Sequence, residues 1–543
     1  MKSKFYILQN LGLLIAGVLC FALAFPTDLC NMGLPFLSYI AFIPIFLLTQ
    51  RASWKTVWLY GFAYGTLGYC VFVSWLATFD PVSMPVIAGM YGIYLMITFP
   101  LLKVGAVFFP KYKAFAQWVV WCAYEYVKTL GFSGFHYGVT AYSHWKFIPF
   151  IQSASVVGVF GLSAFITFFS AWGTAVINDK AASWKEKVSN HKISGCIWLS
   201  LYAIILIFGF ASQKDYSSYE TKTVALIQTN TDPWVGGAVA YSRDLETLIK
   251  LSDAAIESNP NVDFVVWSET AFVPRIQWHY EKRQDRSMLK LVQNLLTYID
   301  SKDIPFVIGN DDGTMGYNID GVYTEVDYNG ALVFTPKKNV IPPNPEKYHK
   351  MHLVPFTEHF PFKKLLPTIY NYLVANDTHF WEVGSEPVVF EIDGLKFSVP
   401  ICFEDTFGYI GRRFVLNGAR AFVNMSNDAW AKSKACQLQH LSMAVFRSVE
   451  NRVPSVRATS SGETSIVDIN GRVVKSIPSF ESNFLVGEIP VIDDYKPTIY
   501  TLLGDYVGIV FVFLTFILLS VGIILRVKDK KSMKTKEKSH GKN

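Results

Sequence analysis

The sequence predicts an α-helical membrane domain that crosses the bilayer several times, joined to a soluble α/β domain. Of the 543 residues, the first 210 or so and a stretch before the C-terminal tail consist of long apolar runs. Residues 213–500, between these parts, carry mixed charges, with short β-branched segments alternating with helical ones. The chain is also longer than one hydrophobic core usually serves, so we expect at least two folding units.

Eight segments are long and apolar enough to cross a hydrocarbon layer of about 30 Å. Seven precede residue 213, which predicts a membrane domain at 1–212, and the eighth lies within 501–526. We expect the charged tail at 527–543 to be solvated and disordered. The eight segments lie near 5–25, 34–49, 57–79, 84–107, 114–130, 154–177, 194–212 and 505–526.

Lysine and arginine residues are concentrated in alternate connections between these spans and in the tail, whereas Asp28 and Asp80 lie in the other connections. The positive-inside rule therefore predicts that both termini are cytoplasmic and that the soluble domain lies across the membrane. In a bacterium this is a multi-pass protein of the inner membrane with a periplasmic domain. Glu125 is ionisable but lies inside the fifth span, and we expect a structural pair with Lys128, one helical turn away.

Residues 213–500 show short apolar strands alternating with amphipathic helices, which indicates a layered α/β domain. The strands are apolar almost without interruption, as is typical of strands buried on both faces. We expect strands at 223–227, 262–267, 306–309, 388–392, 397–401 and 421–425, and helices at 241–258, 286–299 and 437–449.

Three polar residues lie at or near the ends of such segments. Glu269 follows the strand at 262–267, Cys402 follows the strand at 397–401, and Lys350 lies in an aromatic and histidine-rich stretch. Strand ends in α/β sheets are where sites assemble. A thiolate, a carboxylate and an ammonium group suffice for acyl transfer, because they supply a nucleophile, a proton acceptor and a donor to the oxyanion. The lysine would also favour the thiolate.

Other chemistries find little support in the sequence. His349 and His352 flank Lys350 without a third ligand, so we expect neither a metal nor a cofactor. The net charge is +6 and no basic face interleaved with aromatic residues is evident, which argues against nucleic acid. We expect Cys436 to be inert. The seven cysteines, which form no CxxC pair, are Cys20, Cys30, Cys70, Cys122, Cys196, Cys402 and Cys436.

The segments around the three residues resemble the Glu-Lys-Cys triad of the carbon–nitrogen hydrolase (nitrilase) superfamily. They are Trp-Ser-Glu ending at Glu269, Lys350 with Leu-Val-Pro-Phe three residues later, and Cys-Phe-Glu-Asp beginning at Cys402. With eight spans around this domain, the whole chain resembles the bacterial apolipoprotein N-acyltransferases. The resemblance implies an α-β-β-α sandwich. Further matching stretches lie at 131–132, 158–163, 228–230, 427–430, 439–440 and 457–459.

The resemblance implies a two-step reaction. Cys402 would attack the sn-1 ester of a phospholipid and form a thioester, with Glu269 as proton acceptor and Lys350 as oxyanion donor. The acyl chain would then pass to the N-terminal α-amine of a diacylglyceryl-cysteine apolipoprotein, which completes lipoprotein maturation. The partners are thus a phospholipid, an apolipoprotein and the bilayer, and we expect a monomer.

Supporting roles also follow from the resemblance. Glu358 would orient or assist Lys350, Glu404 would act beside the nucleophile, and Trp234 would lie in a mobile loop near the entrance. Asn427 and Asp428 would cap a turn and shape the site. The chain departs from the family at Phe403, where a tyrosine is usual, and at Thr357, where a glycine is usual.

Two other functions compete with acyl transfer to a protein. One is a membrane-anchored amidase of the nitrilase fold with water as acceptor, although one anchoring helix would serve it. The other is a transporter with an extracytoplasmic sensing domain, although the spans show neither paired charges nor inverted repeats. The aromatic segment at 360–381 is either a core helix or an amphipathic lid on the membrane surface, and we favour the lid.

Overall fold

The computed structural model describes residues 2–318, 321–375 and 378–540, and the chain divides into two compact units. The first unit comprises Met1–Ser212 and Asp505–Asn543, and the second comprises Gln213–Gly504. The first is built of helices alone, as far as the described residues extend, apart from one isolated bridge between Thr27 and Cys30. The second contains all twelve strands found in the described residues.

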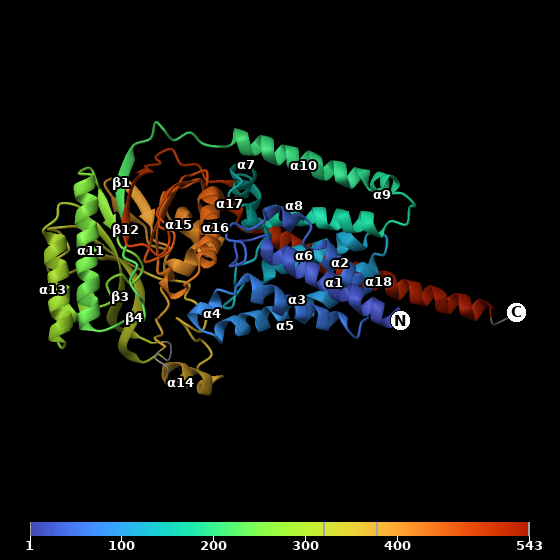
Figure 1. Ribbon diagram of the computed structural model, residues 1–543, viewed down its shortest axis with the longest axis horizontal. Coiled ribbons are helices and arrows are strands. Elements are labelled where there is room, and N and C mark those ends of the chain that lie inside the picture. The colour runs from blue at the N-terminus through green and yellow to red at the C-terminus, as the bar shows by residue number, and fades with distance from the viewer. Residues whose placement is uncertain (1, 319–320, 376–377, 541–543) are drawn as a thin grey trace. The chain divides into compact units, whose positions relative to one another are not determined.

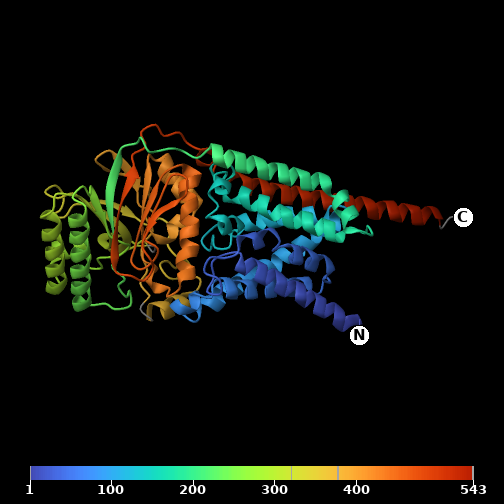
Figure 2. The same ribbon diagram turned by 45° about the horizontal axis from the view of Figure 1, so that its top comes forward.

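Five helices of the first unit are long and apolar enough to cross a membrane. The chain is therefore a membrane protein with several spanning helices, while the number eight stays a prediction. Seen in two orientations, the long helices of this unit run roughly along one common direction (Figures 1 and 2). The five are α1 (Lys2–Leu23), α5 (Ser83–Phe108), α8 (Ala154–Asn178), α10 (Lys192–Ala211) and α18 (Tyr506–His540).

The three remaining expected spans correspond to shorter elements. The span expected at 34–49 is divided into a 3₁₀ turn, η1 (Pro35–Tyr39), and α2 (Ile43–Arg51), which begins with Pro44 in its first turn. Proline lacks an N–H donor, so it starts a helix more readily than it continues one. The span expected at 57–79 likewise divides, into α3 (Val57–Phe72) and α4 (Leu76–Phe79), and the one expected at 114–130 is α6 (Lys113–Val127).

The expected pair of Glu125 with Lys128 is wrong. Glu125 accepts hydrogen bonds from the Trp121 indole (3.2 Å) and from the Thr140 hydroxyl. Lys128 donates instead to the Tyr69 hydroxyl and to the Tyr137 carbonyl, both at 3.2 Å. Because these neighbours satisfy both groups, the two side chains form no direct pair with each other.

The C-terminal tail also differs from expectation. Helix α18 continues beyond the apolar stretch to His540, and residues 541–543 lie outside the described residues. The segment from Arg526 to His540 contains neither proline nor glycine and is rich in lysine, which has a good helix propensity. Once the spanning part is helical, continuing the helix needs no new nucleus.

The second unit contains two six-stranded sheets. The first sheet has the order β12-β1-β2-β3-β4-β5, in which β1, β2 and β3 are parallel. Its strands are β1 (Thr221–Gln228), β2 (Phe264–Val266), β3 (Phe306–Tyr317), β4 (Tyr323–Phe334), β5 (Glu346–His349) and β12 (Asn483–Pro490). The second sheet has the order β11-β10-β9-β8-β7-β6, in which β7, β8 and β9 are parallel. Its strands are β6 (Phe390–Ile392), β7 (Leu395–Ser398), β8 (Ala421–Ser426), β9 (Ser455–Thr459), β10 (Ser465–Val467) and β11 (Val473–Ser476).

Two helices, α11 (Ala238–Ser258) and α13 (Arg286–Asp300), cover the outer face of the first sheet (Figure 1). Helix α13 has apolar residues three and four positions apart, which form one buried face. Asp285 caps its N-terminus by accepting from the amide of Ser287 at 2.8 Å. The core formed by these helices and the sheet includes Leu248, Val265, Trp267, Val292 and Leu295, all at most 1% exposed.

The second sheet has its own helical layer, α15 (Gly408–Leu416) and α16 (Lys434–Asn451), so the layers follow the order α-β-β-α (Figure 1). The sheets meet through apolar side chains, among them the stacked rings of Phe264 and Phe397, 5.9 Å apart. The expected layered α/β domain is thus confirmed. Short helices complete the unit: α12 (Ile276–Lys282), α14 (Pro367–Ala375) and α17 (Ile499–Leu503).

Candidate active site

Lys350 lies between two carboxylates. It directly follows β5, and its side chain is fully buried. Its Nζ is 3.1 Å from Oε1 of Glu269 and 2.9 Å from Oε1 of Glu358. Glu269 lies three residues beyond β2 and is 5% exposed. A buried ammonium thus has one buried and one partly buried carboxylate partner, as a charge removed from water requires.

Two further donors fix the carboxylate of Glu269. The side-chain amide of Asn329, on β4, donates to Oε1 at 2.7 Å, and the backbone N–H of Asn427 donates to Oε2 at 2.8 Å. Asn427 also caps the short 3₁₀ turn η4 (Asp428–Trp430) through its side chain. Asn329 was not expected at the site, because Tyr-Asn-Gly in a sequence is also typical of a turn.

Cys402 lies at the start of a 3₁₀ turn, η3 (Cys402–Thr406), and is 8% exposed. Strand β7 ends at Ser398, and Ile401 still forms a parallel bridge with Met425 on β8. Cys402 itself has φ = +48°, in the left-handed region that disfavours residues with a Cβ. Such a conformation persists only where its surroundings hold it, and it is concentrated at functional sites.

The charges at the site act on each other. Burial alone lowers the pKa of Lys350, but Glu269 and Glu358 outweigh it and raise this pKa well above its ordinary value. Burial, helped by the charge of Glu269, raises the pKa of the Cys402 thiol well above its ordinary value, and Lys350 opposes this only in part. Lys350 thus favours the thiolate, as expected, although burial and the charge of Glu269 outweigh it.

Glu404 connects the Lys350 segment to the Cys402 segment. Its Oε1 accepts from the Tyr348 hydroxyl at 2.7 Å and from the amides of Met351 and His352 at 2.8 and 3.1 Å. Its Oε2 accepts from the amide of Ile401, next to the cysteine, at 2.8 Å. Burial raises the pKa of Glu404 to about 7. Glu404 thus acts as a structural bridge, and Tyr348 is a partner that the sequence did not reveal.

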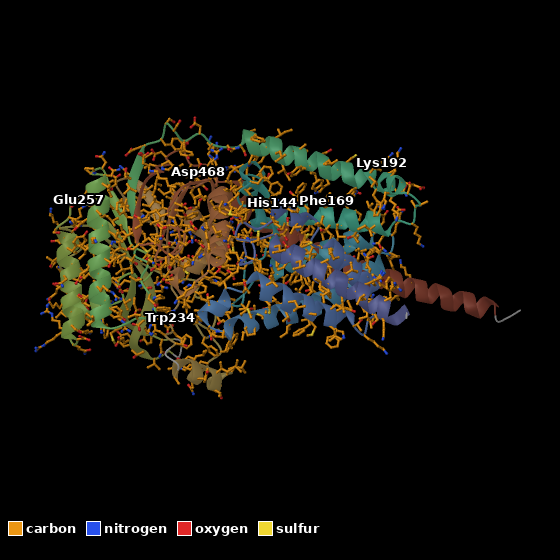
Figure 3. The ribbon with its side chains drawn as sticks, in the orientation of Figure 1. His144, Phe169, Lys192, Trp234, Glu257 and Asp468 are labelled. Carbon is orange, nitrogen blue, oxygen red and sulfur yellow. The ribbon has the colours of Figure 1, made fainter. Side chains whose placement is uncertain are left out.

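The remaining residues singled out in the sequence differ in how deeply they are buried. Trp234 lies in the loop before α11 and is 62% exposed (Figure 3). Phe403 is 7% exposed, and its ring is 4.8 Å from that of Phe407. Asp428 is buried and contacts His440 at 3.1 Å. His352, two residues after Lys350, contacts the Tyr409 hydroxyl at 2.8 Å.

Among the described residues, one group has the geometry of metal ligands, namely Asp311, Asp327 and His379, whose ligand atoms lie within 4.8 Å of each other. Arg275 already contacts Asp311 at 3.4 Å and Asp327 at 2.7 Å. Because this guanidinium already balances the negative charge of the two carboxylates, we assign the group to an ion-pair network rather than to a metal site. His349, the other histidine beside Lys350, pairs with Asp312 at 2.9 Å.

Comparisons with known proteins cover almost the whole chain. A family model described as carbon-nitrogen hydrolase matches residues 223–496, and one described as the apolipoprotein N-acyltransferase N-terminal domain matches residues 16–172. Apolipoprotein N-acyltransferase 1 of Treponema denticola is 42% identical over 94% of this chain and 95% of that relative. Its counterpart in Treponema pallidum is 44% identical with the same coverage. The solved structure of Nit3 from Saccharomyces cerevisiae, of the nitrilase superfamily, aligns with 51% of this chain and 93% of its own at 18% identity and a TM-score of 0.36.

Proposed function

The chain belongs to the apolipoprotein N-acyltransferase family, and on that premise we propose that it transfers a fatty acyl chain from the sn-1 position of a phospholipid to diacylated apolipoproteins. The acceptor is the N-terminal α-amine of their diacylglyceryl-cysteine. The observation that carries this proposal is the similarity over 94% of the chain, membrane unit included, to enzymes named for this reaction. Neither a water-using amidase nor a transporter is favoured, because the named relatives match both units.

In the first half-reaction, Sγ of Cys402 attacks the carbonyl carbon of the ester while Glu269 takes the thiol proton. The raised pKa of Cys402 supports this order, because a resting thiol needs a base at the moment of attack. Lys350 donates to the oxyanion that forms, which suits an ammonium held in place by two carboxylates. The ester C–O bond then breaks, and Glu269 returns the proton to the lysophospholipid oxygen.

In the second half-reaction, the neutral α-amine of the apolipoprotein attacks the thioester carbon. Glu269 takes a proton from the amine, and Lys350 again stabilises the oxyanion. The C–S bond breaks, the amide forms, and the sulfur regains a proton from Glu269. The same three groups therefore serve both steps, and enzyme and protons return to their starting state.

We also propose that the enzyme works as a monomer in the inner membrane, with both termini cytoplasmic and the catalytic domain in the periplasm. This topology is supported by the distribution of lysine and arginine over alternate connections. The donor and the acceptor are both lipid-linked, which fits a catalytic unit anchored by several apolar helices.

The function is tested by incubating the purified protein with phospholipid and a synthetic diacylated lipopeptide, followed by mass spectrometry. We expect a third acyl chain in amide linkage on the lipopeptide, together with lysophospholipid. Free fatty acid without lipopeptide acylation would instead support the amidase. A lipopeptide whose α-amine is acetylated serves as the control, because it keeps both lipid chains but offers no nucleophile.

The segment at 360–381 supports the lid hypothesis for some of its aromatic and apolar residues only. Only Pro367–Ala375 is helical, residues 376–377 lie outside the described residues, and none of α14 is buried. Phe360 is 3% exposed and packs against Phe356 and Tyr370, so it belongs to a core. Leu365, in contrast, is 74% exposed and Phe362 is 39% exposed. We propose that these exposed residues contact the lipid substrate.

Replacing both Phe362 and Leu365 by serine should raise the KM for phospholipid by at least about tenfold and change kcat little, because burying even one large apolar side chain is worth about 1.5–3 kcal/mol. The measurement is lipopeptide acylation over a range of phospholipid concentrations in mixed micelles. Val474, 54% exposed on β11, is the matched control, and Val474→Ser should behave as wild type. An unchanged KM in the double variant would contradict the lid.

A further inference from the structure

A buried group of charged side chains lies next to the nucleophile and has no role in the steps above. It consists of Asp405 on η3, Asp428 on η4, His440 on α16 and Arg457 on β9. Their side chains are at most 4% exposed. Charges removed from water must be paired with opposite charges, so the contacts within this group indicate which side chains are charged.

His440 is the centre of this group. Its Nε2 is 2.8 Å from Oδ1 of Asp405 and 3.2 Å from the carbonyl oxygen of Cys402. Its Nδ1 is 3.1 Å from Oδ1 of Asp428. Arg457 contacts Asp405 and is 3.9 Å from Asp428. The imidazole therefore connects both carboxylates to the backbone of the nucleophile.

The charges indicate a doubly protonated ring. Asp405 and Asp428 carry two negative charges and Arg457 one positive charge, so an imidazolium at His440 makes the group neutral. Burial alone lowers the pKa of His440, but the two carboxylates outweigh both burial and Arg457 and raise it to about 10. Both ring nitrogens then carry a proton, and the single Nε2–H is shared between the nearer Asp405 carboxylate and the Cys402 carbonyl in a charge-assisted, bifurcated bond.

The bond from His440 acts on a strained residue of the backbone. Cys402 has φ = +48°, a conformation that a residue with a Cβ keeps only under constraint. On the N-terminal side, Glu404 accepts from the amide of Ile401 at 2.8 Å. On the other side, His440 holds the carbonyl of Cys402 itself. The backbone conformation of Cys402 sets the direction of its Cβ and hence of its thiol.

We propose that His440 is a positioning residue, which holds the carbonyl of Cys402 and thereby directs the thiol towards Glu269 and Lys350. The inference rests on the proposed role of Cys402 as nucleophile. Asp405 and Asp428 keep the imidazole in the orientation and the charge state that this bond requires. A histidine that only filled the core would affect folding without a specific effect on the thiol.

Two neutral replacements separate these roles in the full-length protein. The side-chain amide of His440→Gln reaches approximately the position of Nε2 and can still donate to Cys402. The shorter amide of His440→Asn reaches approximately the position of Nδ1, keeps Asp428 as a partner and loses the Cys402 contact. The rate of thioester formation on Cys402 is measured by mass spectrometry with phosphatidylethanolamine in mixed micelles as the acyl donor.

We expect His440→Asn to lower the maximal rate of thioester formation about 100-fold with an unchanged KM, as a shift of the reacting atom by about 1 Å does. His440→Gln should recover a substantial part of this loss. Equal losses in both variants while Cys436 stays protected, or wild-type rates in both, would overturn the proposal. If wild-type protein itself formed no thioester on Cys402, the proposed function would fail instead, so the two failures are distinguishable.

Cys436 reports whether the variants remain folded. It is 1% exposed and lies one turn before His440 on α16. Its alkylation by iodoacetamide, followed on its own peptide, should stay as slow as in wild type. If it becomes fast in both variants, helix α16 has opened and Asp428→Asn decides, because it keeps the side-chain shape and removes one charge from the imidazole. A wild-type rate in Asp428→Asn, with Cys436 still protected, would then overturn the proposal, and a loss of about tenfold would support it.

Discussion

Cys402→Ala should abolish both the acyl-enzyme and the transfer of acyl chains, with a loss in rate on the order of 10⁴-fold or more. Without Sγ the first half-reaction has no nucleophile, so the thioester that the second half-reaction consumes cannot form, and Glu269 has no thiol proton to accept. The fold should remain, because the substitution deletes one buried atom. The measurement is lipopeptide acylation by mass spectrometry, combined with a search for a thioester on the peptide that contains residue 402.

Cys436→Ala is the matched control, since Cys436 is also a buried cysteine of the same unit, at 1% exposed. It should acylate the lipopeptide at the wild-type rate. The comparison matters because all seven cysteines are free thiols, so loss of a thiol elsewhere must be shown to be harmless. Residual thioester in Cys402→Ala would mean that another cysteine accepts the acyl chain, and the assignment of the nucleophile would be wrong.

Lys350→Met should have the second-largest effect, and it should act on both activity and stability. Methionine keeps the length of the side chain but removes the donor to the oxyanion, which should slow acylation about 10²–10³-fold. It also leaves the buried carboxylate of Glu269 and the partly buried one of Glu358 without their cation, and breaking a buried pair in this way costs about 3–5 kcal/mol. The measurements are single-turnover thioester formation and the thermal midpoint of unfolding in detergent.

Adding Glu358→Gln to Lys350→Met separates the two effects. The double variant should regain part of the lost stability, because one of the two unpaired carboxylates is gone, but it should stay inactive. Lys337→Met is the control, since Lys337 is 67% exposed and its pair with Asp303 lies at the surface. If Lys350→Met melted at the wild-type temperature, the buried ion pairs would not contribute to stability as argued.

The sequence determined the two-part architecture and predicted the three segments of the proposed triad. Spanning helices can be predicted from a sequence because a helix in lipid needs a long apolar run. Buried parallel strands can be predicted because both of their faces are covered, so their residues are apolar almost without interruption. Glu269, Lys350 and Cys402 were recognisable because each stands next to such a strand or in a distinctive motif. The roles of Asn329, Tyr348 and His440 were not, because each depends on contacts with residues tens of positions away in the chain.

Only the tertiary structure decided the electrostatics. Lys350 lies 81 positions after Glu269 in the chain, yet its Nζ is 3.1 Å from Oε1 of Glu269. The protonation of Cys402 depends on the balance between its burial, Glu269 and Lys350, and no motif expresses that balance. Glu125 and Lys128, in contrast, are only three positions apart and still bond to other partners. Patterns of burial are local in a sequence, whereas charges respond to every neighbour that folding brings within reach.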